Sequence, residues 1–385
     1  MTPAATAARR SDPSIATETG AWWYGRSIDS FLEGRDNSFN LLRFLGALTV
    51  LFSHSFVLSG GVQAKEPAQP IIGDHLSALG VHAFFAISGF LITLSAMRRP
   101  NAVRFVVARL RRIYPGLMVC VALTVVVAGF FLTSMPAFDF FRLGATWEFL
   151  WGNASLLGVR AAVLPWVFTD NPLPAWVNGS LWTLPYEMIC YGLILGLILI
   201  RGATRPGIRL GFLLAGCIVL SVGVANAESL QQWLPMAPGP AVGLRYMQTF
   251  LAGALLAAAS KRLRLSGAML TLAIVVVAGC LWFHYFGWLF KCAFAYALIG
   301  LALLPGGPIR AFNRLGDYSY GLYIYAFPVQ QSLVFWFPGV SAIGLFFAAA
   351  GISLPLAVLS WHAVEKPMLR GKLRMTSNPA KPASL

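Results

Sequence analysis

The chain has 385 residues, of which 57% are hydrophobic and only 11% are charged. Soluble domains carry about 25% charged residues, so this composition excludes an ordinary soluble protein and predicts one embedded in lipid. The net charge of +15 could suggest a nucleic-acid partner. However, the basic residues stand in short clusters between apolar segments, as the topology signals of membrane proteins do, and we expect no nucleic-acid partner.

The N-terminal 37 residues are polar or small and contain four arginines. They lack the apolar core of about 7–15 residues that marks a secretory signal peptide, so we expect residues 1–37 to form a tail. The five cysteines further along show no paired spacing typical of a zinc site or a disulfide framework. We therefore expect no metal site and no bound cofactor.

Apolar stretches recur along the rest of the chain, and each is close to the roughly 20 residues that a helix needs to cross about 30 Å of hydrocarbon. They predict an all-α integral membrane protein with about ten transmembrane helices. The predicted spans are 39–60, 78–97, 113–134, 181–200, 209–226, 242–260, 267–284, 286–304, 317–336 and 341–364.

The arginines and lysines between these spans indicate the orientation. Most of them fall on one side of the membrane when the N-terminus is placed in the cytoplasm, which is the bias of cytoplasmic loops. An even number of spans returns the C-terminus to the same side. We thus expect a cytoplasmic tail at 1–37, a membrane domain at 38–366 and a second cytoplasmic tail at 367–385.

The segment 135–180 interrupts this alternation, because it mixes apolar turns with Pro165, Pro172 and Pro174. We expect an extracytoplasmic loop with a re-entrant or interfacial piece. Irregular backbone at membrane depth is tolerated only where protein or a water-filled cavity satisfies it, so a cavity opening outward is implied.

Ionisable side chains within spans cost at least about 2.5–3.5 kcal/mol on insertion and indicate functional sites. Arg43 and His54 lie eleven residues apart in the first span, which is about three helical turns and about 16 Å along one face. A neutral histidine can take a proton from a hydroxyl, so His54 is a candidate general base. A structural histidine bonded to a neighbouring helix is the alternative. His82, at the start of the second span, could also face the site.

Arg109 and Arg112 stand three residues apart just before the third span. Guanidinium groups suit phosphates, although anchoring of a cytoplasmic loop explains them equally well. Glu187, inside the fourth span, could orient a cationic histidine, bind sugar hydroxyls or pair with an arginine. The tyrosines at the start of the ninth span could line a polar path or form an interfacial belt.

Taken in order, these motifs resemble the acyltransferase 3 family of bacterial multi-pass membrane acyltransferases. The resemblance covers roughly residues 37–370. It rests on Arg43 with His54; Gly80-Val81-His82-Ala83-Phe84-Phe85-Ala86-Ile87-Ser88-Gly89-Phe90-Leu91-Ile92; Arg109 and Arg112 followed by Pro115; Gly179-Ser180-Leu181-Trp182 with Glu187; Ser319-Tyr320-Gly321-Leu322-Tyr323; and Trp361-His362-Ala363-Val364-Glu365-Lys366-Pro367.

The resemblance implies a ten-helix enzyme of the bacterial inner (plasma) membrane. Such an enzyme moves an acyl group, usually acetyl, from cytoplasmic acyl-CoA to a hydroxyl of an extracytoplasmic saccharide or lipid-linked glycan. In this sequence His54 matches the catalytic histidine and Arg43 its essential partner. Arg109 and Arg112 match the arginine pair near the acyl-CoA entrance.

Glu187 joins His54 and Arg43 as a catalytic candidate, and His82, Trp182 and Tyr320 join the two other arginines as substrate-binding candidates. Phe327 departs from the family pattern, because many members carry a histidine at this position before the proline. A role for that histidine is therefore not carried over.

The expected partners are acyl-CoA, a saccharide or glycolipid acceptor and membrane lipids. Some family members continue into an esterase-like domain, whereas about 20 residues follow Glu365 here; a separate periplasmic acyl-transferring protein is thus a further expected partner. Acceptor specificity is expected in 61–77, 135–180 and 227–241. The competing hypothesis is a transporter or flippase for a saccharide or an anionic lipid, which would use the same buried charges as a binding site.

Overall fold

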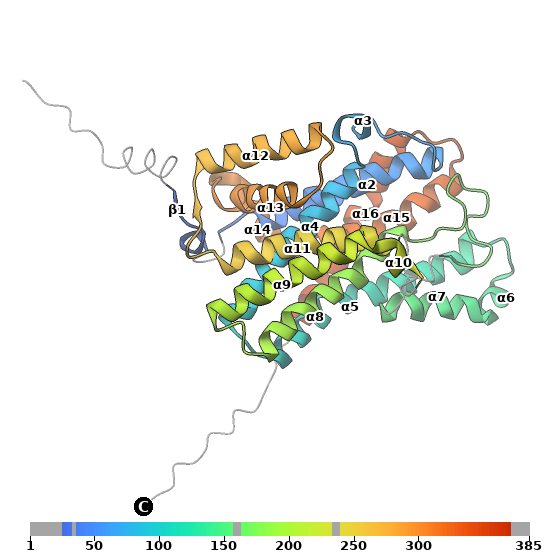
Figure 1. Cartoon of the computed structure of the whole chain (residues 1–385). Coiled ribbons are helices and arrows are strands. Elements are labelled where there is room, and N and C mark those ends of the chain that lie inside the picture. The colour runs from blue at the N-terminus through green and yellow to red at the C-terminus, as the bar shows by residue number, and fades with distance from the viewer. Residues whose placement is uncertain (1–24, 33–35, 157–162, 233–238, 371–385) are drawn as a thin grey trace, which may run out of the picture.

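A computed structural model gives the fold and describes residues 25–32, 36–156, 163–232 and 239–370 (Figure 1). Long helices run side by side through the molecule. They are α2 (Phe39–Gly60), α4 (Leu76–Arg98), α5 (Ala102–Val127), α8 (Thr183–Leu199), α9 (Pro206–Ala225), α11 (Pro240–Ala258), α12 (Gly267–Trp282), α13 (Trp288–Leu303), α15 (Ser319–Trp336) and α16 (Ala342–Ser360).

Short elements connect these helices. They are β1 (Arg26–Ser27), η1 (Ile28–Phe31), α3 (Gln69–Ile72), the π-turn η2 (Ala128–Leu132), α6 (Ala137–Arg142), α7 (Gly144–Ser155), η3 (Gly179–Trp182), α10 (Ala227–Gln231), β2 (Arg264–Leu265), η4 (Gly307–Ala311), α14 (Phe312–Leu315), the π-turn η5 (Trp361–Glu365) and α17 (Lys366–Arg370).

Seven helices among the described residues are long and apolar enough to cross a membrane. The number rises to eight if the bent pair Trp288–Leu303 and Gly307–Leu315 counts as one span, and the apolar helix Gly267–Trp282 is shorter. The all-α, multi-helix character predicted from the sequence is thereby confirmed. The number of ten spans and the side of each terminus stay predictions.

The start of α5 differs from the expected boundary. The apolar run begins at residue 113, but the helix begins at Ala102, where the side chain of Asn101 accepts a hydrogen bond from the Arg104 amide. Such a cap satisfies a free amide of the first turn. The basic residues before the apolar run are therefore helical, and Arg109 and Arg112 share a face of α5.

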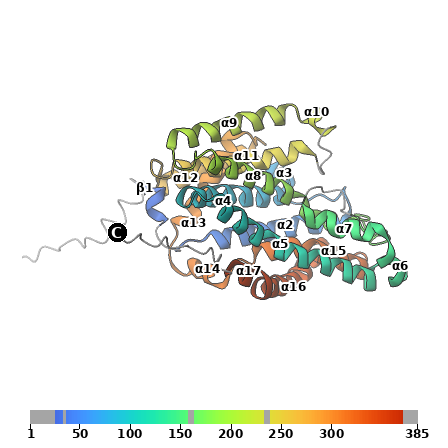
Figure 2. The same cartoon turned by 90° about the horizontal axis from the view of Figure 1, so that it is seen from below.

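Helix α4 lies in the middle of the bundle, between α2 and α11. In Figure 2 it runs between α9 on one side and α16 on the other. Two glycines allow its backbone to approach α11 closely: a Cβ on Gly89 would lie 1.9 Å from the Phe250 carbonyl oxygen, and one on Gly253 would lie 2.1 Å from that of Ala86. Small residues at helix contacts are the usual means of close packing in membranes.

Helices α2, α15 and α16 form the other side of the bundle. The Gln330 side chain of α15 donates hydrogen bonds to the Leu51 carbonyl at 2.9 Å and to Ser55 Oγ at 2.7 Å. All three residues are buried. Since buried polar groups are costly unless paired, these bonds fix the register of α15 against α2.

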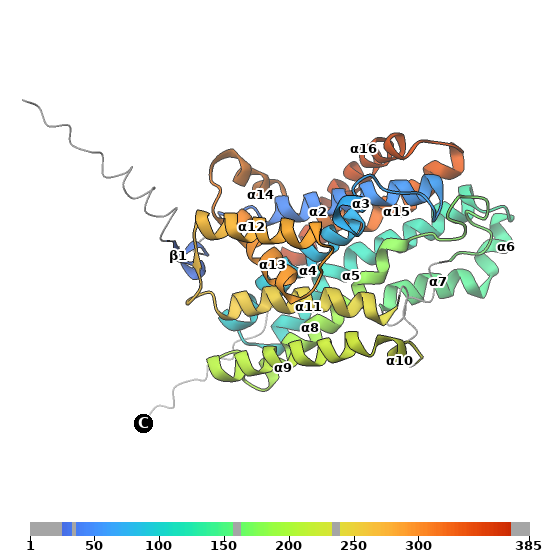
Figure 3. The same cartoon turned by 45° about the horizontal axis from the view of Figure 1, so that its top comes forward.

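The proline-rich segment turns back along the bundle. Helices α6 and α7 lie at the end of the molecule away from β1 (Figures 1 and 3). Helix α7 returns beside α5, so that the Tyr114 hydroxyl donates to the Ser155 carbonyl at 3.3 Å. The chain then comes back to Thr133, which pairs with Val167 in an isolated bridge. Whether this segment re-enters the membrane or lies at its surface stays a prediction.

Part of the expected N-terminal tail packs on the bundle. Strand β1 pairs antiparallel with β2, with Arg26 opposite Leu265, and the following Ile28 is fully buried. Residues 1–24 and 371–385 of the two expected tails lie outside the described residues.

Candidate active site

A buried charge cluster joins α2, α5, the segment just before α15 and η5, the short helix that follows α16. The Asp317 carboxylate accepts from Arg43 at 2.7 Å and from Arg112 at 2.5 Å, both to Oδ2. Arg112 also reaches Glu365 at 3.4 Å. The cluster thus contains two positive and two negative side chains. An unpaired charge buried at this position would lower the stability of the fold.

Both oxygens of the Asp317 carboxylate are engaged. Oδ2 accepts from Arg43 and Arg112, and the Ser319 hydroxyl donates to Oδ1. Asp317 therefore fixes the two guanidinium groups in place.

Neither Asp317 nor Glu365 is among the predicted site residues. Asp317 opens the ninth predicted span, and Glu365 follows the tenth, where η5 presents it to Arg112 and Ser360. An acidic residue at the end of an apolar run is a signal that could have identified both. Their arginine partners lie more than two hundred residues away along the chain, and a single sequence does not reveal such a pairing.

Two adjacent cavities lie beside this cluster. One has a volume of about 160 Å³, and the second about 30 Å³. Arg43, Glu187 and Tyr320 line both, while Arg109 and Arg112 line only the larger one. The structure thereby brings five of the predicted site residues together.

Arg109 and Arg43 keep hydrogen-bonding capacity at these cavities. The Nε atom of each is buried and, within the described residues, has no hydrogen-bond partner. The Arg109 guanidinium lies 5.8 Å from the ring centres of Phe105 and Tyr191. A buried donor without a partner costs about 1–3 kcal/mol, so these two nitrogens are unsatisfied groups beside the cavities.

Glu187 is positioned by two neighbours. Tyr191, one turn further along α8, donates to its Oε1 at 2.5 Å, and Ser88 of α4 donates to the same atom at 3.2 Å. One carboxylate oxygen is thus fixed, and the side chain borders both cavities. This geometry suits either the orienting or the hydroxyl-binding role that the sequence left open.

Tyr320 forms a wall of the larger cavity. Its hydroxyl donates to the Ile113 carbonyl at 2.7 Å, and its ring centre lies 5.4 Å from the Arg112 guanidinium. Gly116 makes room for it, because a Cβ there would come within 2.9 Å of the ring. With its hydroxyl already bonded, Tyr320 contributes its aromatic face rather than a free donor.

His54 lies further along α2 and lines neither of these two cavities. Its ring packs edge-on against Phe327 of α15, with ring centres 5.2 Å apart. Arg43 contacts Asp317 at the start of α15, so both residues turn towards α15, as the shared helix face predicts. The Nδ1 atom of His54 is buried and has no hydrogen-bond partner among the described residues.

A buried carboxylate stands near this histidine. Glu66, in the loop after α2, is 1% exposed and accepts hydrogen bonds from Ser53 at 2.6 Å and from the Leu76 amide at 3.1 Å. It ties Ser53 of α2, the residue before His54, to the first residue of α4. Glu66 is not among the predicted residues, because an acid in a polar loop beside Lys65 looks like ordinary solvent-exposed charge.

Comparison with known proteins decides the family. Residues 36–362 match the family described as "Acyltransferase domain" (Acyl_transf_3). The chain belongs to this family. The resemblance drawn from the sequence motifs is therefore confirmed, and the protein is an acyltransferase.

Curated relatives of this acyltransferase include the "O-acetyl transferase" of Shigella phage Sf6, 29% identical over 87% of this chain and 96% of the phage protein. "Nodulation protein 10" of Rhizobium leguminosarum bv. viciae is 27% identical over 88% of this chain and 94% of the nodulation protein. "Exopolysaccharide production protein ExoZ" of Rhizobium meliloti (strain 1021) is 27% identical over 77% and 92%. No solved structure matches the chain. Together with the apolar helices, these relatives support a membrane O-acyltransferase rather than a transporter.

The remaining two candidates of the acyltransferase lie elsewhere in the bundle. The Nδ1 atom of His82 is 2.7 Å from Thr249 Oγ1 of α11, and the ring packs against Tyr246. Trp182 packs on Tyr186 and Tyr246. Neither lines the two cavities beside the charge cluster, and their part in substrate binding stays a prediction.

Proposed function

We propose that this acyltransferase takes an acetyl group from cytoplasmic acyl-CoA and places it on a hydroxyl of an extracytoplasmic saccharide or lipid-linked glycan. The proposal includes its location in a bacterial inner (plasma) membrane. The names of the relatives support it, since one is an O-acetyl transferase and another is an exopolysaccharide production protein.

The placement of basic residues supports the orientation. The end of α4, the first turns of α9 and the loop after α11 each contribute arginine or lysine to one cavity at the same end of the bundle, and the Arg310 side chain pairs with Asp36 near the start of α2. Clustered basic loops indicate the cytoplasmic side. We therefore place this end in the cytoplasm, with ten helices crossing and both termini on that side.

The observation that carries the proposal is the cavity lined by Arg109, Arg112, Arg43 and Glu187. Its guanidinium groups can donate hydrogen bonds to the carbonyl oxygens of a thioester donor. The Arg43 guanidinium can position the arm of the thioester donor as it passes towards His54, further along α2. Asp317 would hold Arg43 in that position.

His54 would act on the acceptor. Its free Nδ1 accepts the hydroxyl proton while the acceptor oxygen attacks the acyl carbon, and the thiolate of CoA leaves and takes up the proton. In the alternative route the imidazole nitrogen carries the acyl group first and then passes it to the acceptor. Since His54 and Arg43 are about 16 Å apart along the helix, the acyl end must travel along the contact between α2 and α15, past Phe327.

Reconstitution tests the proposal. Purified protein in proteoliposomes would receive radiolabelled acetyl-CoA on one side and a glycan acceptor on the other, and acetylated glycan would be measured. We expect transfer by the wild type, none by His54→Ala, and normal transfer by the matched control His284→Ala, since His284 is exposed and outside the site. Transport of unmodified glycan without acetyl-CoA would instead support the transporter hypothesis and contradict the proposal.

A further inference from the structure

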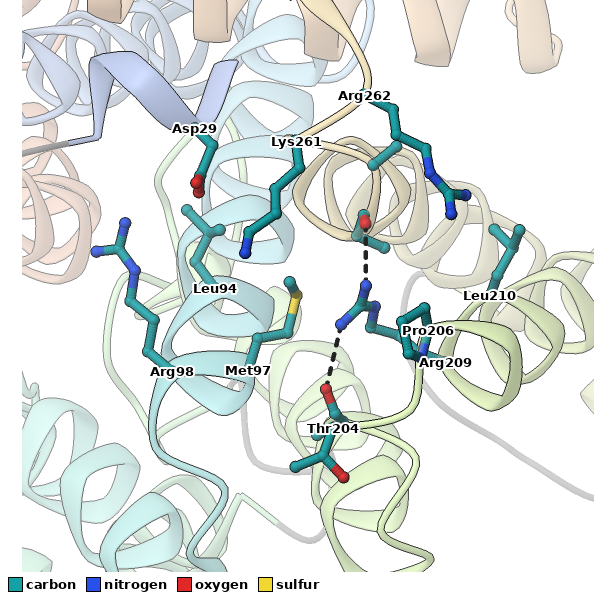
Figure 4. Close-up of a pocket in the computed structure, with 13 residues that line it drawn as sticks. Asp29, Leu94, Met97, Arg98, Thr204, Pro206, Arg209, Leu210, Lys261 and Arg262 are labelled. Atoms are coloured by element: carbon teal, nitrogen blue, oxygen red, sulfur yellow. Dashed lines mark hydrogen bonds between the residues drawn. The ribbon is translucent and has the colours of Figure 1, made fainter. Parts of the chain in front are cut away.

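A third cavity, of about 610 Å³, lies at the basic end of the bundle (Figure 4). Its walls come from η1, the end of α4, the loop and first turn leading into α9, and the loop after α11. The charged side chains that line it are Arg98, Arg209, Lys261 and Arg262, with Asp29 as the carboxylate. The volume is in the range of small-molecule sites.

The positive charge in this cavity is not neutralised by carboxylates. Within the described residues, none of its four basic side chains forms an ion pair, in contrast to Arg43 and Arg112. Arg209 donates to two backbone carbonyls, those of Ala203 at 3.2 Å and Ala258 at 3.3 Å, as Figure 4 shows. Its Nε is buried and has no partner among the described residues.

The start of α9 adds to this positive field. Pro206 is at the first turn of this 20-residue helix and lines the cavity. A helix N-terminus presents free amides and the positive end of its dipole to an anion. Anchoring of cytoplasmic loops explains basic residues at this end, but it does not require them to surround one cavity with an unpaired, buried guanidinium nitrogen.

Shared lining residues place this cavity in a row with the candidate active site. Leu94 and Arg98 also line an adjacent cavity of about 380 Å³, and Leu91 lines both that cavity and the one of Arg109. Residues 91, 94 and 98 follow one another at the spacing of a single helix face. One face of α4 thus leads from the basic cavity to Arg109 and Glu187.

We propose that the basic cavity binds phosphate groups, namely those at the nucleotide end of acyl-CoA. The pantetheine arm would follow Leu94 and Leu91 to the inner cavity. Arg112 is already engaged by Asp317 and Glu365, which leaves the predicted arginine pair with too few free donors for a 3′-phosphate and a diphosphate. The inference rests on the proposed use of acyl-CoA. The phosphate of an anionic lipid headgroup has the same chemistry and is the other source to be tested.

The double variant Lys261→Gln/Arg262→Gln tests this site, because both residues are in a surface loop rather than in the packed bundle. Arg104→Gln is the matched control, since Arg104 is exposed at the same end and outside the cavity. With full-length protein in zwitterionic nanodiscs, we expect the double variant to raise KM for acetyl-CoA about tenfold or more without lowering kcat. Calorimetry with adenosine 3′,5′-bisphosphate should show a matching loss of affinity, and the control should change neither value by more than about twofold.

The outcomes separate the two proposals and the two sources of phosphate. If the wild type transfers acetyl groups but the double variant keeps its KM and its nucleotide affinity, the inference is overturned and the proposed function stands. If the variant instead loses only phosphatidylglycerol, detected by native mass spectrometry, the occupant is a lipid headgroup and the nucleotide assignment is overturned. If no acetyl transfer occurs but nucleotide affinity still depends on Lys261 and Arg262, the proposed function fails and the phosphate site stands.

Discussion

Replacement of Asp317 by asparagine should destabilise the bundle and stop catalysis together. Its carboxylate joins Arg43 and Arg112, whose side chains are only 18% and 14% exposed. Asparagine keeps the shape but removes the charge, which leaves two buried guanidinium groups against Glu365 alone. Removing one partner of a buried ion pair costs about 3–5 kcal/mol, and we expect a loss of this size in the free energy of unfolding.

Asp36→Asn provides the matched control. Asp36 also pairs with an arginine, Arg310, but its side chain is 70% exposed, and exposed pairs contribute about 0–1 kcal/mol. Unfolding of each purified variant in mixed micelles would be followed by tryptophan fluorescence, and acetyl transfer would be measured in proteoliposomes. If Asp317→Asn unfolds like Asp36→Asn and still transfers acetyl groups, the charge cluster does not position Arg43 and the reasoning is refuted.

Three further substitutions test other parts of the structure. Glu187→Gln preserves hydrogen bonding to Ser88 and Tyr191, so we expect unchanged unfolding but acetyl transfer slower by about 10²-fold or more; an unchanged rate would remove Glu187 from the catalytic set. Glu66→Gln should lower the free energy of unfolding by about 1–3 kcal/mol, because the buried bonds to Ser53 and the Leu76 amide weaken, and a thermal midpoint equal to that of the wild type would contradict this. Gly89→Ala should cost about 1–3 kcal/mol or more through overpacking against α11, whereas Gly192→Ala, with no atom within 4 Å of the added methyl, should cost nothing; equal unfolding of the pair would argue against the close α4–α11 contact.

The positions of the long helices could be predicted from the sequence because the thickness of the bilayer sets the length of each apolar run. The expected first span, 39–60, coincides with α2. Helix α5 begins eleven residues before the predicted span 113–134, because a cap at Asn101, and not the change in polarity, starts that helix. Local hydrogen bonding of this kind does not appear in an apolarity pattern.

The candidate site could be predicted only in part. Arg43 and His54 stood out because charge within an apolar run is expensive, and the helical period placed them on one face. Asp317 and Glu365 were missed as site residues because their role depends on arginines distant in sequence. His82, by contrast, was chosen as a site residue because it lies in a span. Its position in the sequence does not reveal that its Nδ1 lies against Thr249 of α11.

Surface glycans of cells offer the most direct measurement of the central claim. Mass spectrometry would compare cells without the gene with cells that express the wild type, His54→Ala or His284→Ala at equal membrane levels. The proposed function predicts an added 42 Da per acetyl group on a glycan from the wild type and from His284→Ala, and none from His54→Ala or from cells without the gene. Identical glycan masses in all four strains, or full acetylation with His54→Ala, would contradict the proposal that His54 transfers an acetyl group to an extracytoplasmic hydroxyl.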